Sequence, residues 1–148
     1  MTDSPAKARI FVDADVLFAG SASPNQYSAS LVILRMGEIT LIKTITSQQV
    51  ISEVERNLQQ KIPAALTTFR MLVSRCLEVL PDPTQEEVDA LNAAANPKDL
   101  PILAAAVKYN CQFLTTYNIK HFQPGIKTLT VLLPGDLVQR VRYLMSSL

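Results

Sequence analysis

The sequence predicts an α/β fold, in which a mostly parallel β-sheet is covered by helices on both faces. Five short apolar or β-branched runs alternate with segments of helical periodicity. Such alternation is typical of parallel sheets, because two parallel strands need a crossover connection that is usually a helix. Composition agrees with this class, since 148 residues, of which 48% are hydrophobic, provide one buried core.

One domain is expected over residues 8–148, preceded by a short polar tail, residues 1–7. The tail lacks the apolar segment of a signal peptide, and no apolar run reaches the roughly eighteen residues of a membrane span. We therefore expect a cytoplasmic protein with no membrane partner. Cys76 and Cys111 lack the paired spacing of a zinc site and are expected to be buried, structural thiols.

The net charge of +1 does not predict a strong, non-specific nucleic-acid binder. A local basic rim remains compatible with this balance. The candidates for it are two pairs of arginines: Arg70 with Arg75, and Arg140 with Arg142.

The first strand is expected at residues 9–12, an apolar run that stops at Asp13. A buried strand of this kind delivers an acid to its C-terminal end, where α/β proteins place their sites. Residues 20–25, rich in Gly, Ser and Pro, predict a loop. A helix is then expected over residues 28–36, with its stop at Gly37.

The middle of the chain continues the alternation. Residues 40–45 predict a short strand, and Ser47 is the expected cap of a helix that runs to about Gln60, with Glu53 near its first turns. Pro63 is expected to open another helix.

The third strand is expected at residues 77–80, where a Pro-Asp-Pro turn ends it. Thr84 and Glu87 resemble a capping box for a helix that runs through Leu91.

The last third of the chain predicts an Ala-rich helix over residues 98–110, with Asp99 in its first turn. Strands are expected at 112–115 and 128–132, and Pro134 is expected to start a final amphipathic helix. The apolar stripe of that helix is expected to be core or dimer surface: Leu137, Val138, Val141 and Leu144.

Acidic and polar side chains are expected to meet at one edge of the sheet. Asp13 ends the first strand, Asp99 starts a helix, and the turn at 115–118 follows a later strand. Strand C-termini and helix starts lie at the same edge of a parallel sheet. Glu53 is expected to join them from its own helix.

Such a cluster favours metal-assisted hydrolysis. Neighbouring carboxylates are costly to ionise together unless a cation neutralises them, and hard oxygen ligands favour Mg²⁺ or Mn²⁺. The ion would activate a water and neutralise charge building on a phosphodiester. No other nucleophile is indicated, since His121 is the only histidine and the sequence contains neither a Gly-x-Ser-x-Gly elbow nor a Gly-rich phosphate loop.

At these residues the chain resembles the PIN domain family of metal-dependent nucleases, which includes VapC-type toxins. Residues 10–17, Ile-Phe-Val-Asp-Ala-Asp-Val-Leu, are similar to the family's opening strand and Asp-x-Asn-Val-Leu motif, with Asp15 where asparagine is usual. The helix that carries Glu53 is similar to the second acidic motif, and the Asn-Pro-Lys-Asp sequence ending at Asp99 is similar to the third. The resemblance implies that Asp13, Glu53 and Asp99 are the catalytic residues and metal ligands.

The fourth motif departs from the family pattern. Residues 114–122 resemble Leu-Val-Thr-x-Asp-x-x-x-Phe, with Asn118 in the place of the acid. Asn118 would then be a metal ligand without charge, while Asp15 and Thr116 would support the site, the latter by orienting a ligand through its hydroxyl. The resemblance further implies an α/β/α sandwich, Mg²⁺ or Mn²⁺ as cofactor, RNA as substrate, frequent homodimers and, for a toxin, an antitoxin protein as partner.

Two alternative functions remain open. The Asp13-Ala14-Asp15 sequence also looks like the opening motif of haloacid-dehalogenase-type phosphatases, with Asp13 as nucleophile and Asp15 as acid and base. In the other alternative, Asn118 marks a site that has lost catalysis, and the domain only binds RNA or a protein. Weak or absent metal binding would distinguish that alternative.

Overall fold

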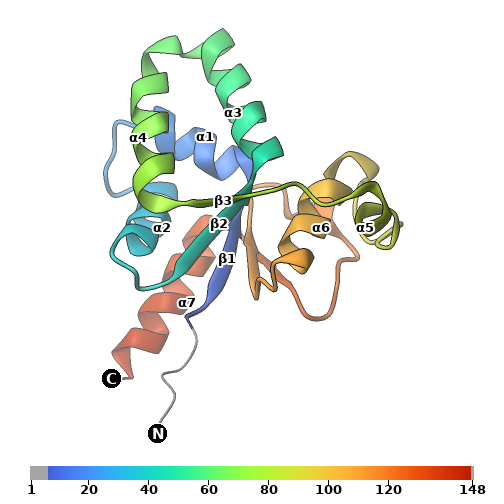
Figure 1. The fold of residues 1–148 in the computed structure, drawn as a ribbon. Coiled ribbons are helices and arrows are strands. Elements are labelled where there is room, and N and C mark those ends of the chain that lie inside the picture. The colour runs from blue at the N-terminus through green and yellow to red at the C-terminus, as the bar shows by residue number, and fades with distance from the viewer. Residues whose placement is uncertain (1–6, 148) are drawn as a thin grey trace, which may run out of the picture.

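A five-stranded parallel sheet forms the centre of the computed structural model, which describes residues 7–147 (Figure 1). The strand order is β3-β2-β1-β4-β5. This confirms the predicted fold class. The predicted boundary of the polar tail involves residues 1–6, which lie outside the described residues. The strands are β1 (Arg9–Val12), β2 (Lys43–Ser47), β3 (Glu78–Leu80), β4 (Phe113–Thr115) and β5 (Thr130–Leu132).

Helices connect these strands. The α-helices are α1 (Ala14–Ala22), α2 (Ala29–Glu38), α3 (Gln48–Lys61), α4 (Leu66–Cys76), α5 (Gln85–Asp89), α6 (Leu100–Lys108) and α7 (Pro134–Ser146). Short 3₁₀ turns add η1 (Pro63–Ala65), η2 (Pro97–Asp99) and η3 (Ile119–Phe122). No helix among residues 7–147 has the length and apolar character needed to cross a membrane.

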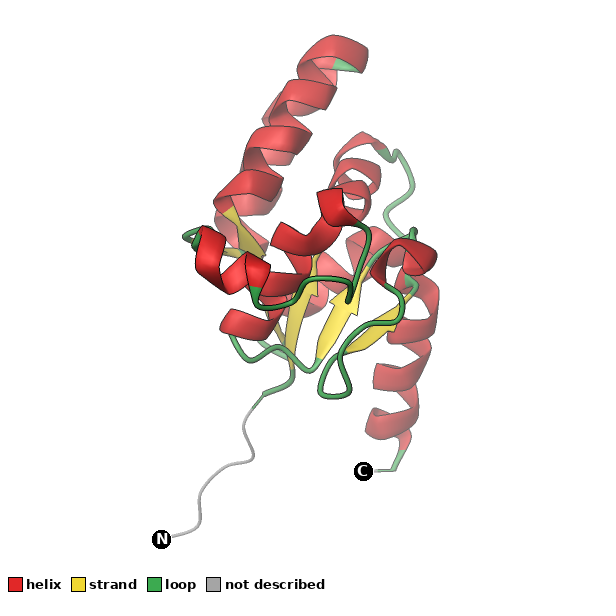
Figure 2. Ribbon diagram, turned by 90° about the vertical axis from the view of Figure 1, so that its right-hand side faces the viewer, coloured by secondary structure: helices red, strands yellow, loops and turns green. Residues whose placement is uncertain are grey.

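The helices cover both faces of the sheet, as Figure 2 shows. Ile10 and Phe11 are neighbours on β1, so their side chains point to opposite faces. Both are fully buried, and they belong to two different hydrophobic clusters. A central parallel strand covered on both sides explains why residues 9–12 form an apolar run without alternation.

The apolar stripe of α7 divides between core and surface. Leu137 is 1% exposed and packs in the cluster that contains Ile10, whereas Leu144 near the C-terminal end is 60% exposed. Val138 and Val141 are partly buried against the same cluster. The start of the helix is therefore core.

Both cysteines are buried and free, as expected. Burial is the largest cause of the raised pKa of each thiol, which reaches about 11 for Cys76 and for Cys111. The two side chains are therefore protonated and unreactive near neutral pH.

Two glycines that predicted breaks lie inside helices. Gly20 is buried within α1, and α2 continues through Gly37 to Glu38. A Cβ at Gly20 would lie 3.2 Å from Leu34 Cδ1, and one at Gly37 would overlap the Thr44 side chain and stand 2.9 Å from the Cys76 carbonyl oxygen. Both glycines serve close packing, so the predicted loop at 20–25 begins too early and the predicted stop at Gly37 is wrong.

Substitution of Gly37 by alanine is expected to lower the free energy of unfolding by about 1–3 kcal/mol, because the new methyl group overpacks a site bounded by backbone. Gly135→Ala is the matched control, since a Cβ there meets nothing within 4 Å and α7 gains a better helix former. Urea unfolding of both variants measures the difference. Equal stability of the two would contradict the packing role of Gly37.

Several predicted boundaries move for local reasons. Thr40 adopts a positive φ of 65°, which excludes it from a strand, and β2 begins at Lys43. Ser47 stands at the N-cap of α3 but its side chain caps nothing; instead, Asp82 from the Pro-Asp-Pro turn accepts a hydrogen bond from Gln49 N at 2.8 Å. The predicted capping box at Thr84 is present, although its helix ends at Asp89.

Candidate active site

The pairing of β1 with β4 places the first two site residues. Val12 pairs with Thr115, and Asp13 N donates a hydrogen bond to Thr115 O at 3.1 Å. The next side chains therefore meet beyond the edge of the sheet, where the Thr116 hydroxyl donates to Asp13 Oδ2 at 2.8 Å. Asp13 also caps α1, with Oδ1 accepting from Ala14 N at 2.7 Å. These contacts hold a carboxylate that is only 8% exposed.

One oxygen of Asp15 anchors the segment between β4 and η3. Asp15 Oδ2 accepts hydrogen bonds from Tyr117 N and Asn118 Nδ2, each at 3.0 Å, and lies 3.3 Å from Thr116 Oγ1. A hydroxyl carries one proton, so Thr116 donates to the nearer acid, Asp13. The other oxygen, Asp15 Oδ1, is buried and has no hydrogen-bond partner.

Two further acids reach the same place from other helices. Glu53 lies in α3 and is partly buried. Asp99 ends the 3₁₀ turn that precedes α6, rather than lying within the first α-helical turn as predicted, and its side chain caps nothing. Asp99 Oδ2 is buried and accepts no hydrogen bond, although His121 Nδ1 lies 3.3 Å away.

These side chains line a cleft of about 350 Å³. Thr116 is buried beneath Asp13 and does not line the cleft. The polar lining residues are Asp13, Asp15, Gln49, Glu53, Arg56, Lys98, Asp99, Asn118 and His121. Gln49 and Arg56 were not among the predicted site residues. Their spacing is a signal for them, because residues three and four positions from Glu53 share its helix face.

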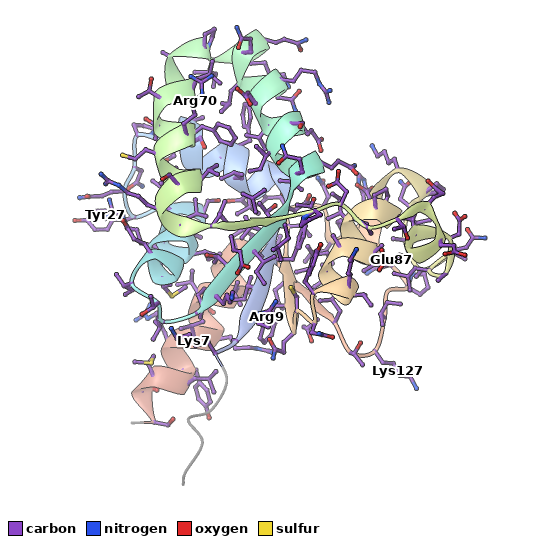
Figure 3. All side chains as sticks on the ribbon, in the orientation of Figure 1. Lys7, Arg9, Tyr27, Arg70, Glu87 and Lys127 are labelled. Carbon is purple, nitrogen blue, oxygen red and sulfur yellow. The ribbon has the colours of Figure 1, made fainter. Side chains whose placement is uncertain are left out.

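The predicted arginine pairs do not form the rim of this cleft. Arg70 lies on α4 (Figure 3). It pairs with Glu55 at 3.1 Å. Arg140 stands over the ring of Phe113, 5.5 Å from its centroid. The cations that line the cleft are instead Arg56 and Lys98.

Burial makes Asp13 and Asp15 hard to ionise. The pKa of Asp13 is raised from 3.8 to about 7, mainly by burial and next by the negative charge of Asp15. Hydrogen bonds from Thr116 and Ala14 act in the opposite direction. The pKa of Asp15 is also raised, again mainly by burial. Without a cation, Asp13 is therefore partly protonated near neutral pH, and strongly shifted pKa values of this kind cluster at functional sites.

The donor set fits a hard divalent cation. Buried Asp15 Oδ1 and Asp99 Oδ2 lack hydrogen-bond donors, and carboxylates with one amide are the ligands that Mg²⁺ and Mn²⁺ prefer. Among residues 7–147, however, no three His, Cys, Asp or Glu side chains stand close enough to hold one ion. The acids surround the cleft without converging on a point, so ligation requires side chains to turn inward.

Comparisons with solved structures find proteins of the same fold. The fold is similar to VapBC2 from Rickettsia felis bound to a promoter DNA fragment, with a TM-score of 0.63 and 16% identity over 84% of this chain and 98% of that one. It is also similar to PAE2754 from Pyrobaculum aerophilum, with a TM-score of 0.67 and 20% identity over 92% and 96%. VapC20 from Mycobacterium tuberculosis, a Sarcin-Ricin loop cleaving toxin, gives a TM-score of 0.50 and 17% identity over 71% and 86%.

The curated proteins contain no significant match. At these identities, the solved structures establish a shared fold. The family itself follows from the sequence, because the model of the PIN domain matches residues 9–120, which is most of the chain. The protein belongs to the PIN domain family.

Proposed function

We propose that this protein is a ribonuclease that uses Mg²⁺ or Mn²⁺ to hydrolyse RNA phosphodiesters at the cleft of Asp13, Glu53 and Asp99. The observation that carries the proposal is that one cleft is lined by Asp13 after β1, Glu53 of α3 and Asp99 of η2. Asp99 Oδ2 is buried there without a hydrogen-bond partner. Membership of the PIN domain family supports a nuclease in general.

Asp13, Glu53 and Asp99 would hold the metal, with Asn118 as a neutral ligand. The Asn118 amide nitrogen is engaged by Asp15, so its oxygen is the atom left for that role. When bound, the cation offsets the negative charge of the acids, lowers the pKa of a water and neutralises charge that builds on the phosphate. Thr116 keeps Asp13 oriented through its hydroxyl.

The remaining residues of the cleft would act on the substrate. Arg56 and Lys98 would contact phosphates and fix the strand over the acids. Asp15 would keep the segment of Tyr117 and Asn118 in place, because its Oδ2 accepts hydrogen bonds from Tyr117 N and Asn118 Nδ2. No covalent enzyme intermediate is needed, because water is the nucleophile.

The likeness to VapBC2 supports an additional proposal, that a toxin-like role would bring an antitoxin protein as partner. The phosphatase alternative rested on Asp13-Ala14-Asp15 alone, and family membership removes its basis. The binding module remains the second candidate, because Asn118 replaces an acid and the carboxylates do not converge as they stand.

Cleavage of a labelled single-stranded RNA, with Mn²⁺, Mg²⁺ or EDTA, tests the nuclease. We expect cutting that needs metal and falls at least about 100-fold in Asp13→Asn and in Asp99→Asn. Asp136→Asn, at an exposed position on α7, is the matched control and should cut normally. A folded wild-type protein that never cuts and binds no Mn²⁺ would instead favour the binding module.

A further inference from the structure

A second depression adjoins the acidic cleft, in the groove between α1 and α3. These two helices pack against one another (Figure 1). The depression has a volume of about 220 Å³. Its wall is shared with the cleft at Ala14, Asp15 and Glu53, and its own residues are Phe18, Asn57 and Lys61.

Helical spacing explains why the two hollows are continuous. Glu53, Asn57 and Lys61 are four residues apart on α3 and therefore share one face, which borders the buried apolar residues of that helix. On α1, Phe18 follows Asp15 by three positions and lies on the same face. From Glu53 to Lys61 the groove leads away from the acids over about 12 Å of helix.

The side chains of this groove differ in chemistry from those of the cleft. Phe18 packs its ring partly on the core, and Lys61 Nζ lies 5.9 Å from the ring centroid. Lys43, Arg70 and Lys108 are each paired with a glutamate, whereas Lys61 forms no ion pair within residues 7–147. The groove thus offers an aromatic surface, an amide and an uncompensated ammonium.

We propose that this groove binds one nucleotide of a single strand, next to the nucleotide whose phosphate is cut. The base stacks on Phe18, the Asn57 amide contacts the base edge or the sugar, and Lys61 contacts a phosphate. Aromatic stacking with nearby cations is how proteins hold single strands. Lys61 is exposed and has a long, flexible side chain. Its ammonium group can therefore move off the face of the Phe18 ring when a base stacks there. The identity of the strand as RNA rests on the proposed function.

Binding without hydrolysis tests this subsite. Fluorescence anisotropy of a labelled single-stranded oligoribonucleotide in EDTA is measured for wild type, Phe18→Leu and Phe18→Trp. We expect Phe18→Leu to weaken binding about tenfold and Phe18→Trp to retain it, because base stacking on an aromatic ring is lost only in the first. Leucine preserves most of the apolar packing, and the melting temperature verifies that the variant is folded.

The lysine supplies an independent test. Lys61→Gln should weaken binding and reduce the slope of log affinity against log salt by about 0.7, the value for one phosphate contact of a single strand. Lys127→Gln removes the same charge from an exposed loop that lies away from α3 (Figure 3) and should leave the slope unchanged.

The outcomes separate this subsite from the nuclease function. Absence of single-strand binding by wild type, or equal binding by Phe18→Leu and Phe18→Trp, overturns the subsite. So does duplex RNA that binds with the same dependence on Phe18, since its bases are stacked inside. Binding through Phe18 by a protein that never cuts RNA retains the subsite and rejects the nuclease. RNA cleavage that does not change on substitution of Phe18 and Lys61 supports the nuclease and rejects the subsite.

Discussion

Replacement of Asp13 by asparagine is expected to stabilise the metal-free protein at about pH 8, by up to roughly 4 kcal/mol. Burial and the neighbouring charge of Asp15 raise the pKa of Asp13 from 3.8 to about 7, so ionisation of this carboxyl in the folded state is costly. An amide does not ionise. By the usual scaling for a chain of this size, the melting temperature should rise on the order of 10 °C.

The sign follows from the direction of the shift. Between about pH 4 and pH 7, the folded state holds a proton on Asp13 that the unfolded state has lost, so the free energy of unfolding of wild type falls as pH rises. The advantage of Asp13→Asn should therefore be small near pH 4 and full above about pH 7. Asparagine can preserve the local contacts, since its oxygen accepts from Ala14 N and its nitrogen donates to the Thr116 hydroxyl.

Thermal melts in EDTA across this pH range measure the effect. Asp136→Asn is the control, and loss of its favourable position in the first turn of α7 should lower stability slightly, by no more than about 1 kcal/mol. Mn²⁺ should narrow the difference at high pH, because a ligand that binds only the folded wild type raises its stability. A variant that is no more stable than wild type at high pH would refute the costly ionisation of Asp13.

The sheet and the location of the acids at one edge of it could be predicted because both follow from patterns that are local in sequence. An apolar run followed by an acid, as at Asp13, describes a buried strand and the edge where it ends. Asp99 precedes an Ala-rich helix, and the starts of helices lie at this same edge of a parallel sheet. Parallel topology then brings the two together without any knowledge of side-chain contacts.

What could not be predicted depends on contacts between distant segments. The sequence around Gly37 predicts the end of a helix. In the structure, the missing side chain lets Thr44 and the Cys76 carbonyl pack close to the helix, a contact that no local pattern reveals. The α3 cap comes from Asp82, thirty-three positions beyond Gln49. The same limit applies to the burial that raises the pKa of Asp13 and to the hydrogen bond between Asp15 and Asn118.

The hydrogen bond between Asp15 and Asn118 leads to the second prediction. Each single substitution of these residues should impair the site, and exchanging the two residues should restore Mn²⁺ affinity and stability. Asp15 stands where the family pattern has asparagine, and Asn118 stands where it has an acid. The structure places Asn118 Nδ2 3.0 Å from Asp15 Oδ2. One carboxylate and one amide therefore lie next to each other in the site. Residue 118 lacks the negative charge of the family pattern, and residue 15 carries one in its place.

Mn²⁺ titration by calorimetry measures the consequence, with the melting temperature in EDTA as a second observable. Asp15→Asn removes a carboxylate and a hydrogen-bond acceptor, and we expect the affinity for Mn²⁺ to fall about 10–100-fold. Asn118→Asp places two carboxylates at hydrogen-bond distance, so the metal-free protein should lose stability as pH rises. In the double variant Asp15→Asn/Asn118→Asp, the amide again donates to the carboxylate, and both observables should return most of the way to wild type.

The double variant decides whether the site has lost the carboxylate at residue 118 or has moved that carboxylate to residue 15. Additive effects would mean that Asp15 and Asn118 act independently, since coupled residues are the ones whose effects fail to add. In that case Asn118 would mark a weakened site, and the binding module would gain support. Recovery would mean that the charge needed at this position is supplied from α1 in place of the segment after β4, because the two side chains already occupy adjoining space and differ only in which of them carries the carboxylate.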